Sequence, residues 1–183
     1  FTVATVATVT PNKNYGRLLD IANEAKRRGL DINFIVAGRV NKNHQGYYDK
    51  ILEKKKNLNL LNVNFTGECF KVKEFLLAAN IYLCCSNNEA SPTSVWEGMA
   101  TGLPAITTDV GNVRQVIRNG IDLEVFKPSK SGALIKDYNL HNKFIILGVA
   151  SNWTEKKGFF VCESFVSFFQ NILIDVRIVN MTI

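Results

Sequence analysis

The sequence predicts a doubly wound α/β domain, built on a parallel β-sheet and followed by a linker and a β-α-β tail. Two observations support this fold class. Short apolar runs alternate with longer helical patterns, and the runs are apolar throughout rather than at every second residue. Strands of that kind are typical of a parallel sheet that helices cover on both faces. Right-handed crossovers between them give the doubly wound arrangement, which we expect over residues 1–118.

The predicted elements of this domain alternate between strand and helix. In chain order they are strand 1–7, helix 14–28, strand 32–37, helix 46–56, strand 63–66, helix 72–79, strand 81–85, helix 92–101, strand 105–108 and helix 112–118. Gly29 and Gly102 end two of the helices, as glycine commonly does after a last helical turn. Ligands of such sheets bind beyond the carboxyl ends of the strands, so the loops that follow the strands are the expected site.

The remainder of the chain has a different organisation. Residues 119–143 contain Pro128, Ser129 and Gly132 and are predicted to be a linker. Residues 144–183 are predicted to form the β-α-β tail, with strand 144–149, helix 158–171 and strand 176–179.

This tail resembles the start of the chain, and we interpret it as a partial internal repeat. Phe1 and Ala7 recur as Phe144 and Ala150, and both copies carry a lysine in the loop after the strand. A central position in one sheet can be filled only once. We therefore expect the tail to add to an edge of the sheet, to swap into another molecule as a strand-swapped dimer, or to pack loosely.

The positive charge of the chain is concentrated in one part of it. The net charge is +6, and residues 13–56 hold eleven Lys/Arg against five Asp/Glu. Such a surface suits an anionic membrane, a nucleic acid or a phosphorylated ligand, although a pair of solvated helix faces is the interpretation that we prefer. No RNA-binding aromatic motif, zinc-finger spacing or recognition helix is evident, so no nucleic-acid partner is expected.

The cysteines and histidines indicate neither a disulfide framework nor a metal site. The four cysteines include the adjacent Cys84 and Cys85 at the end of an apolar strand, where thiols pack well. Their spacing predicts a reducing, cytoplasmic compartment. His44 and His141 lie in polar segments without a partner at ligand spacing, so no metal is expected. No apolar run reaches the ~20 residues that span a bilayer, and we recognise no secretory signal.

The loop after strand 81–85 has the most informative sequence. We expect Ser91 to cap the next helix and Pro92 to occupy its first position. The N–H groups of Thr93 and Ser94 would then be free at the helix start, which is an anion site suited to a diphosphate. The hydroxyl groups of these residues can add hydrogen bonds.

Two carboxylates flank this helix start, Glu89 just before it and Glu97 in its second turn. Carboxylates beside an anion site are unexpected if phosphate is the only ligand. They fit a ligand that also carries hydroxyl groups, because an ionised carboxylate accepts hydrogen bonds from sugar O–H groups. A nucleotide sugar has hydroxyl groups at both ends and phosphates between them. The alternative is an ordinary acidic pair that suits the helix dipole.

At this point the sequence resembles the retaining glycosyltransferases of family 4, also called group 1. The resemblance rests on the E-x7-E motif of residues 89–97 and continues through residues 97–104 and 108–111. Residues 63–67 and 11–14 also look like family segments. By this resemblance, residues 1–118 form the Rossmann-like, donor-binding C-terminal domain of a GT-B enzyme.

The resemblance implies a role for each candidate residue. Glu89 is the catalytic residue that contacts the donor sugar, and Glu97 binds the ribose hydroxyls. Lys13 binds the diphosphate as a point charge that neutralises the leaving group. The other donor-binding candidates are Ser91, Thr93 and Ser94. The family transfers a sugar from a UDP- or GDP-linked donor with retention and without a metal cofactor.

The resemblance also implies partners. The acceptor would be a glycan or a lipid-linked glycan, as in polysaccharide biosynthesis, and the N-terminal acceptor domain is missing from this chain. We expect a cytoplasmic protein, with peripheral contact at the inner membrane face as an open alternative.

Three classes of function stay open at this stage. The first is the donor half of a sugar transferase. The second is a non-catalytic nucleotide-sugar-binding domain, or a truncated or rearranged fragment. The third and weakest is a dinucleotide-dependent oxidoreductase, because no G-x-G-x-x-G follows the first strand.

Overall fold

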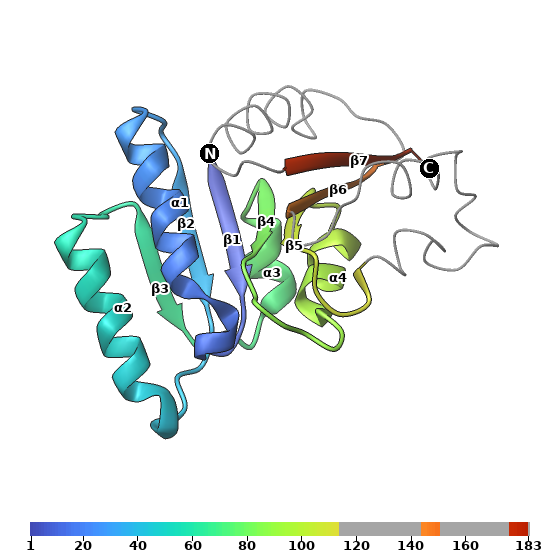
Figure 1. Ribbon diagram of the computed structural model, residues 1–183. Coiled ribbons are helices and arrows are strands. Elements are labelled where there is room, and N and C mark those ends of the chain that lie inside the picture. The colour runs from blue at the N-terminus through green and yellow to red at the C-terminus, as the bar shows by residue number, and fades with distance from the viewer. Residues whose placement is uncertain (114–143, 151–175, 183) are drawn as a thin grey trace.

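The computed structural model describes residues 1–113, 144–150 and 176–182, and its strands form one sheet in the order β3-β2-β1-β4-β5-β6-β7 (Figure 1). The strands are β1 (Thr2–Val6), β2 (Asn33–Ala37), β3 (Val63–Gly67), β4 (Ile81–Cys84), β5 (Ala105–Thr108), β6 (Phe144–Ala150) and β7 (Val176–Thr182). The α-helices are α1 (Tyr15–Arg27), α2 (Gln45–Asn57), α3 (Val72–Leu77) and α4 (Thr93–Ala100). Short 3-10 turns η1 (Pro11–Lys13) and η2 (Lys42–His44) precede α1 and α2.

The first five strands are all parallel, which confirms the predicted fold class. The strand order reverses between β1 and β4, because the chain first builds β2 and β3 on one side of β1 and then crosses to the other side. Val3 pairs with Phe34 of β2 and with Ile81 of β4. This reversal is the switch point at which open α/β sheets bind ligands.

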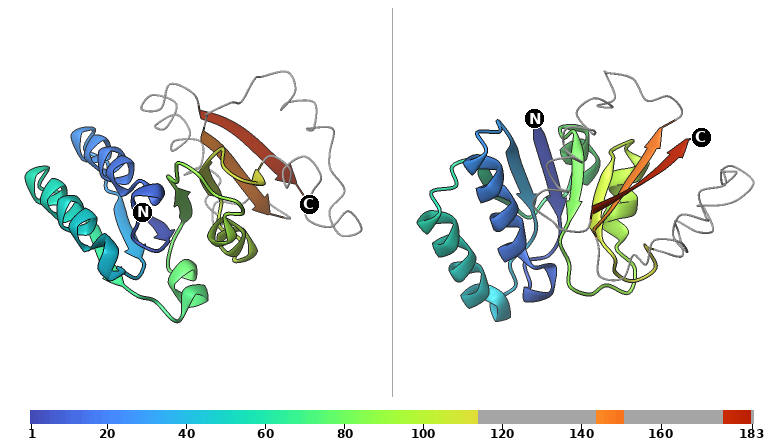
Figure 2. Two further views of the ribbon diagram at one scale, coloured as in Figure 1. Left: turned by 60° about the horizontal axis from the view of Figure 1, so that its bottom comes forward. Right: turned by 45° about the horizontal axis from the view of Figure 1, so that its top comes forward.

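Alternation of side chains along the strands builds a separate apolar core on each face. Val3 of β1 packs with the buried residues of α1 and α2, whereas its neighbour Ala4 packs with those of α3 and α4. Tyr82 and Leu83 of β4 divide in the same way. Helices α1 and α2 therefore cover one face and α3 and α4 the other, as Figures 1 and 2 show.

The observed bounds of the helices follow from local capping chemistry. The side chain of Asn14, in the left-handed conformation at φ 50°, accepts a hydrogen bond from the Arg17 N–H (3.3 Å) and begins α1. Gly29, at φ 68°, closes the turn after α1, and its N–H donates to the Lys26 carbonyl (3.0 Å). Asparagine and glycine adopt this conformation most readily, which is why they stand at the two ends.

The tail adds two strands beyond β5. Strand β6 pairs with β5 in the antiparallel sense, with Ala105 opposite Leu147, and β7 pairs with β6 in parallel (Figure 2). Of the three placements expected for the tail, this is addition to an edge, and β1 keeps the central position.

Several sequence predictions concern residues outside the described part. They are the linker 119–143, the helix 158–171 and most of the helix 112–118. The domain boundaries at residues 118 and 143 and the repeat itself stay predictions.

Candidate functional site

A cleft of about 360 Å³ opens at the carboxyl ends of β1, β2 and β3 and is closed on one side by the start of α4. Its lining consists of Val6, Ala7, Thr8, Lys13, Ala37, Gly38, Arg39, Glu68, Cys69, Thr93, Ser94 and Glu97. The cleft therefore lies at the switch point beside β1, where the topology predicts a ligand site.

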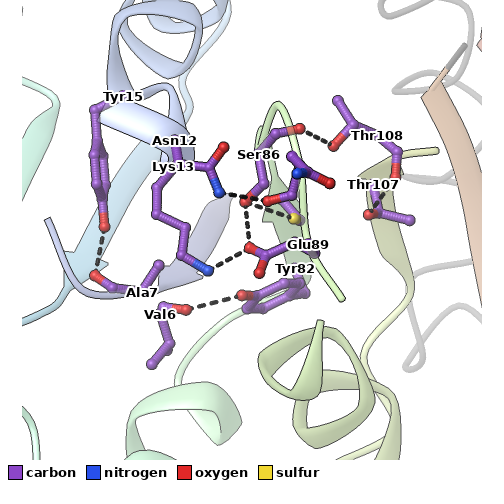
Figure 3. A network of polar contacts seen from close by, with 12 residues as sticks. Val6, Ala7, Asn12, Lys13, Tyr15, Tyr82, Ser86, Glu89, Thr107 and Thr108 are labelled. Carbon is purple, nitrogen blue, oxygen red and sulfur yellow. Dashed lines mark hydrogen bonds and ion pairs between the residues drawn. The ribbon is translucent and has the colours of Figure 1, made fainter. Parts of the chain in front are cut away.

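Four of the six candidate residues line this cleft: Lys13, Thr93, Ser94 and Glu97. Glu89 is not part of the lining, but its carboxylate forms an ion pair with the Lys13 ammonium group (Figure 3). The side chains of Lys13 and Glu89 are only 23% and 14% exposed. The structure thus brings the E-x7-E motif and the lysine of the first loop to one place, although 76 residues separate Lys13 from Glu89.

The two loops that carry this ion pair are joined by three further hydrogen bonds. The Asn12 amide donates to the Asn88 carbonyl (2.5 Å), and the Asn14 amide donates to the Asn87 side-chain oxygen (2.9 Å). The Asn87 N–H donates back to the Asn12 carbonyl (2.8 Å). We call residues 12–14 and 86–89 together the β1–β4 rim. Their cross-links hold Lys13 opposite Glu89.

Glu89 has a second partner in Ser86, which follows β4 and is 3% exposed. The Ser86 hydroxyl donates to Oε1 of Glu89 at 2.7 Å (Figure 3). The Ser86 carbonyl accepts a hydrogen bond from the Thr108 hydroxyl at 2.6 Å, which ties the loop to the end of β5. The same carboxylate oxygen, Oε1, is therefore held by a cation and by a buried hydroxyl.

The turn after β5 supports the loop that carries Glu89. Gly111 has φ 57°, and a Cβ atom there would stand 2.6 Å from the Glu89 carbonyl oxygen and 2.5 Å from that of Ala90. A side chain at this position would thus be strained and would displace the Glu89 backbone. This contact explains the glycine of the segment 108–111 that the sequence analysis singled out.

Two buried tyrosines fix the end of β1, which forms the floor of the cleft. The Tyr15 hydroxyl donates to the Ala7 carbonyl (2.5 Å) and the Tyr82 hydroxyl to the Val6 carbonyl (3.1 Å). Burial is the main cause that raises the pKa of both Tyr15 and Tyr82 above the usual 10.0. Both phenols therefore stay protonated and act as hydrogen-bond donors.

The start of α4 differs from the prediction. Helix α4 begins at Thr93 with Pro92 as its N-cap residue and without a side-chain cap, so the expected capping role of Ser91 is wrong. The Ser91 hydroxyl instead accepts from the Trp96 indole (3.4 Å), and the Ser91 carbonyl accepts the Thr93 N–H (2.9 Å). Pro92, at φ −79° and ψ 74°, is the central residue of a tight γ-turn that precedes the helix.

This turn changes which amide is free at the helix start. The prediction of a free Thr93 N–H is wrong, and within residues 1–113 the Ser94 N–H is the one of the two without a hydrogen-bond partner. The start of α4 therefore offers the Ser94 amide and the Thr93 hydroxyl as donors to an anion, and Lys13 in the same cleft adds an ammonium group.

The opposite side of the cleft was missed by the sequence analysis. We call residues 38–39 and 68–69, which follow β2 and β3, the β2–β3 rim. It carries an ion pair between Arg39 and Glu68 at 3.8 Å, with side chains 62% and 45% exposed. The topological rule pointed to these loops, but no motif in them marked an individual residue. Gly38 is required here, because a Cβ would stand 1.8 Å from the Ala7 carbonyl oxygen.

The structure bears on three further expectations within the residues that it describes. No group of three or more His, Cys, Asp and Glu side chains comes together there as a metal site would require. Among the described helices, none combines the length and the apolar character needed to cross a membrane. Cys84 and Cys85 are buried in the two cores, as predicted for packing thiols, and burial raises the pKa of Cys85.

The fold and the cleft define a doubly wound α/β domain whose cleft combines a helix start that has a free amide with carboxylate side chains. The family model of the glycosyl transferases group 1 matches residues 1–155, and the chain belongs to this family. The EpsD protein of Bacillus subtilis (strain 168), which is named as a glycosyltransferase, is 30% identical over 126 residues. These residues are 68% of this chain and 32% of EpsD, so the chain spans about a third of that relative.

Solved structures share the fold at low sequence identity. HepE of Anabaena, in complex with UDP and glucose, has a TM-score of 0.59 at 19% identity over 63% of this chain and 31% of HepE. The pneumococcal O-GlcNAc transferase GtfA, in complex with UDP and GlcNAc, has a TM-score of 0.52 at 20% identity over 62% of this chain and 22% of GtfA. The predicted group 1 membership is confirmed, whereas family 4 and retention are finer statements that these matches do not reach.

Proposed function

We propose that this chain is the donor-binding part of a retaining glycosyltransferase of family 4, which transfers a sugar from a nucleotide sugar to an acceptor. Membership of the group 1 family supports the proposal. The observation that carries it is the cleft itself, which joins Lys13, the start of α4 and Glu97, with Glu89 paired to Lys13 at its edge.

The proposed ligand lies along the cleft with its diphosphate at the start of α4. The Ser94 N–H, the Thr93 hydroxyl and Lys13 donate to the phosphate oxygens. Glu97, exposed on the cleft wall, accepts hydrogen bonds from the ribose hydroxyls, and Glu89 accepts them from the donor sugar. Ser91 does not line the cleft, and its hydroxyl is bonded to Trp96. Its role in donor binding stays a prediction.

In this arrangement the chain contributes to catalysis by position and charge. The donor sugar is held beside Glu89, and the negative charge that develops on the leaving diphosphate is stabilised by Lys13 and the helix start. No metal is required in the proposal, because Lys13 supplies the neutralising cation. Addition of a chelator is therefore expected to leave donor binding unchanged.

A second candidate is a nucleotide-sugar-binding domain without transfer activity of its own. The cleft is compatible with it, because Lys13, the start of α4 and Glu97 suffice to bind a nucleotide sugar without an acceptor site. Incubation of the chain with a nucleotide sugar and a panel of glycan acceptors separates the two candidates, because only the transferase forms a glycosylated product.

The proposal extends to partners and place in the cell. The acceptor is a glycan or a lipid-linked acceptor, and an N-terminal acceptor domain binds it. We propose a cytoplasmic protein; the alternative is peripheral contact at the inner membrane face through the basic ends of α1 and α2, such as Arg27 and Lys56, which are exposed. A strand-swapped dimer through the tail is the remaining partner prediction.

Calorimetric titration with UDP and GDP tests the function. Wild-type protein should bind at least one of them, and Glu97→Ala should bind it about tenfold more weakly, because hydrogen bonds to a charged group contribute about 1.5–3 kcal/mol. Glu53→Ala, which removes an exposed carboxylate from α2, is the matched control and should bind like wild type. Equal affinities of wild type and Glu97→Ala would remove Glu97 from the site.

A further inference from the structure

Ser86 is a buried polar residue whose side chain the proposed function does not yet use. Its hydroxyl donates to Oε1 of Glu89 at 2.7 Å, and the residue is 3% exposed. A serine buried to this degree needs a hydrogen-bond partner, but a backbone carbonyl would have satisfied it equally well. Here the partner is the carboxylate that is proposed to contact the donor sugar.

The surroundings of Ser86 fix the direction of its hydroxyl. Thr108, at the end of β5, donates to the Ser86 carbonyl at 2.6 Å. The Cys84 thiol, at the end of β4, lies 3.6 Å from the Ser86 hydroxyl oxygen. Two adjacent strands of the rigid sheet therefore position Ser86, which in turn positions a carboxylate on a loop. Groups held by strands are placed more accurately than groups held by loops alone.

The other partner of Glu89 is not fixed in this way. Lys13 lines the cleft and is the cation proposed for the diphosphate, so the phosphate oxygens compete with Glu89 for its ammonium group. Once a nucleotide sugar is bound, Lys13 is shared or withdrawn. Among the described residues, Ser86 is then the side chain that still holds Glu89.

We infer that Ser86 is a positioning residue that keeps the Glu89 carboxylate directed at the donor sugar while the diphosphate engages Lys13. The inference rests on the proposed function. It separates two parts of donor affinity, because Ser86 bonds to Glu89, which is proposed for the sugar, whereas none of its hydrogen bonds goes to Lys13, Thr93 or Ser94, which are proposed for the diphosphate. Loss of the hydroxyl should therefore weaken binding of the nucleotide sugar and leave binding of the free nucleoside diphosphate unchanged.

The test compares these two ligands by calorimetry on the whole chain. The probes are UDP with UDP-glucose and UDP-GlcNAc, and GDP with GDP-mannose, and the pair that the wild type binds is used throughout. Ser86→Ala should weaken binding of the nucleotide sugar about tenfold, as expected for loss of one hydrogen bond to a charged group. Its affinity for the nucleoside diphosphate should stay within twofold of the wild-type value. Ser86→Thr keeps a hydroxyl and should restore most of the sugar-dependent affinity.

A double-mutant cycle decides whether the effect passes through Glu89. In a Glu89→Ala background, Ser86→Ala should have no further effect on nucleotide-sugar affinity, because the group that it positions is absent. Thr107→Val is the matched control, since it also removes a buried hydroxyl but one that donates to the Thr108 carbonyl at 2.9 Å. It should change neither affinity.

The outcomes distinguish this inference from the function on which it rests. If Ser86→Ala weakens binding of both ligands equally, or if its effect adds to that of Glu89→Ala, Ser86 has only a structural role. The inference is then overturned, while the proposed function stands. If the wild type binds none of the five probes, the proposed function and the inference fall together.

Discussion

The two rims of the cleft are held in different ways. Three hydrogen bonds and the Lys13–Glu89 ion pair cross-link the loops of the β1–β4 rim, and its charged side chains are largely shielded. The β2–β3 rim has one side-chain ion pair, between Arg39 and Glu68, and both side chains are at least 45% exposed. The backbone of the β2–β3 rim is nevertheless held in place, because Gly38 packs closely against the Ala7 carbonyl oxygen.

This difference assigns different properties to the two ends of the ligand site. Groups that act on a reacting sugar must be in place before the ligand arrives, since reorganisation during the reaction raises the barrier. The β1–β4 rim meets that requirement. Exposed side chains such as Arg39 can instead adapt to whichever group the remaining part of the ligand presents.

The largest effect is expected at Gly111, which packs against the backbone of the β1–β4 rim. Gly111→Ala combines an unfavourable positive φ, at about 1–2 kcal/mol, with displacement of the Glu89 and Ala90 carbonyls. We expect the free energy of unfolding to fall by about 3 kcal/mol or more, and nucleotide-sugar affinity to fall with it. Urea denaturation and calorimetry measure the two effects.

Gly29→Ala is the matched control for that substitution. Gly29 has φ 68°, but nothing lies within 4 Å of the Cβ position. It should therefore show the conformational cost alone, about 1–2 kcal/mol, and no change in affinity. Equal costs for the two variants would show that the turn after β5 does not support the β1–β4 rim.

Alkaline titration tests the floor that both rims share. Burial raises the pKa of Tyr15 and Tyr82 above 10.0 in the folded chain, so above about pH 10 the unfolded chain loses protons that the folded chain retains. The contribution of the two tyrosines to the free energy of unfolding is therefore fully present below that pH and is lost as the pH rises. Tyr82→Phe should make the fall shallower by about 1 kcal/mol between pH 10 and 11. An unchanged slope in urea denaturation at pH 10 to 11 would contradict a buried, protonated Tyr82.

The smallest effects are expected at the ion pairs of the two rims, which two substitutions compare directly. Lys13→Met removes a shielded cation and should lower the free energy of unfolding by about 1–2 kcal/mol. Arg39→Met removes an exposed cation with a 3.8 Å contact and should change it by less than about 0.5 kcal/mol. Urea denaturation at low and high salt measures both. Similar losses would mean that the rims do not differ in rigidity as described.

The sequence was sufficient to predict most of the parallel sheet, because buried strands and helix-ending glycines leave local signals. The strand predicted at 105–108 is observed with the same bounds, and the helix predicted at 46–56 is observed one residue longer at each end. The group 1 resemblance also selected Lys13 and Glu97, which line one cleft.

Other features of the site depend on contacts between distant segments and left no local signal. The Asn12–Asn88 and Asn14–Asn87 bonds join loops more than 70 residues apart. The bond from Ser86 to Glu89 becomes apparent only when the loop conformation is known. At the start of α4 the local rule itself failed, because Ser91 and Pro92 form a tight turn instead of a side-chain cap.

A crystal structure of the chain with its nucleotide sugar would test the central claim most directly. The account predicts the diphosphate at the start of α4, with Lys13 on the phosphate oxygens and Glu89 on the sugar hydroxyls, still bonded to Ser86. A nucleotide bound away from the Thr93–Ser94 turn, or a sugar placed far from Glu89, would contradict it.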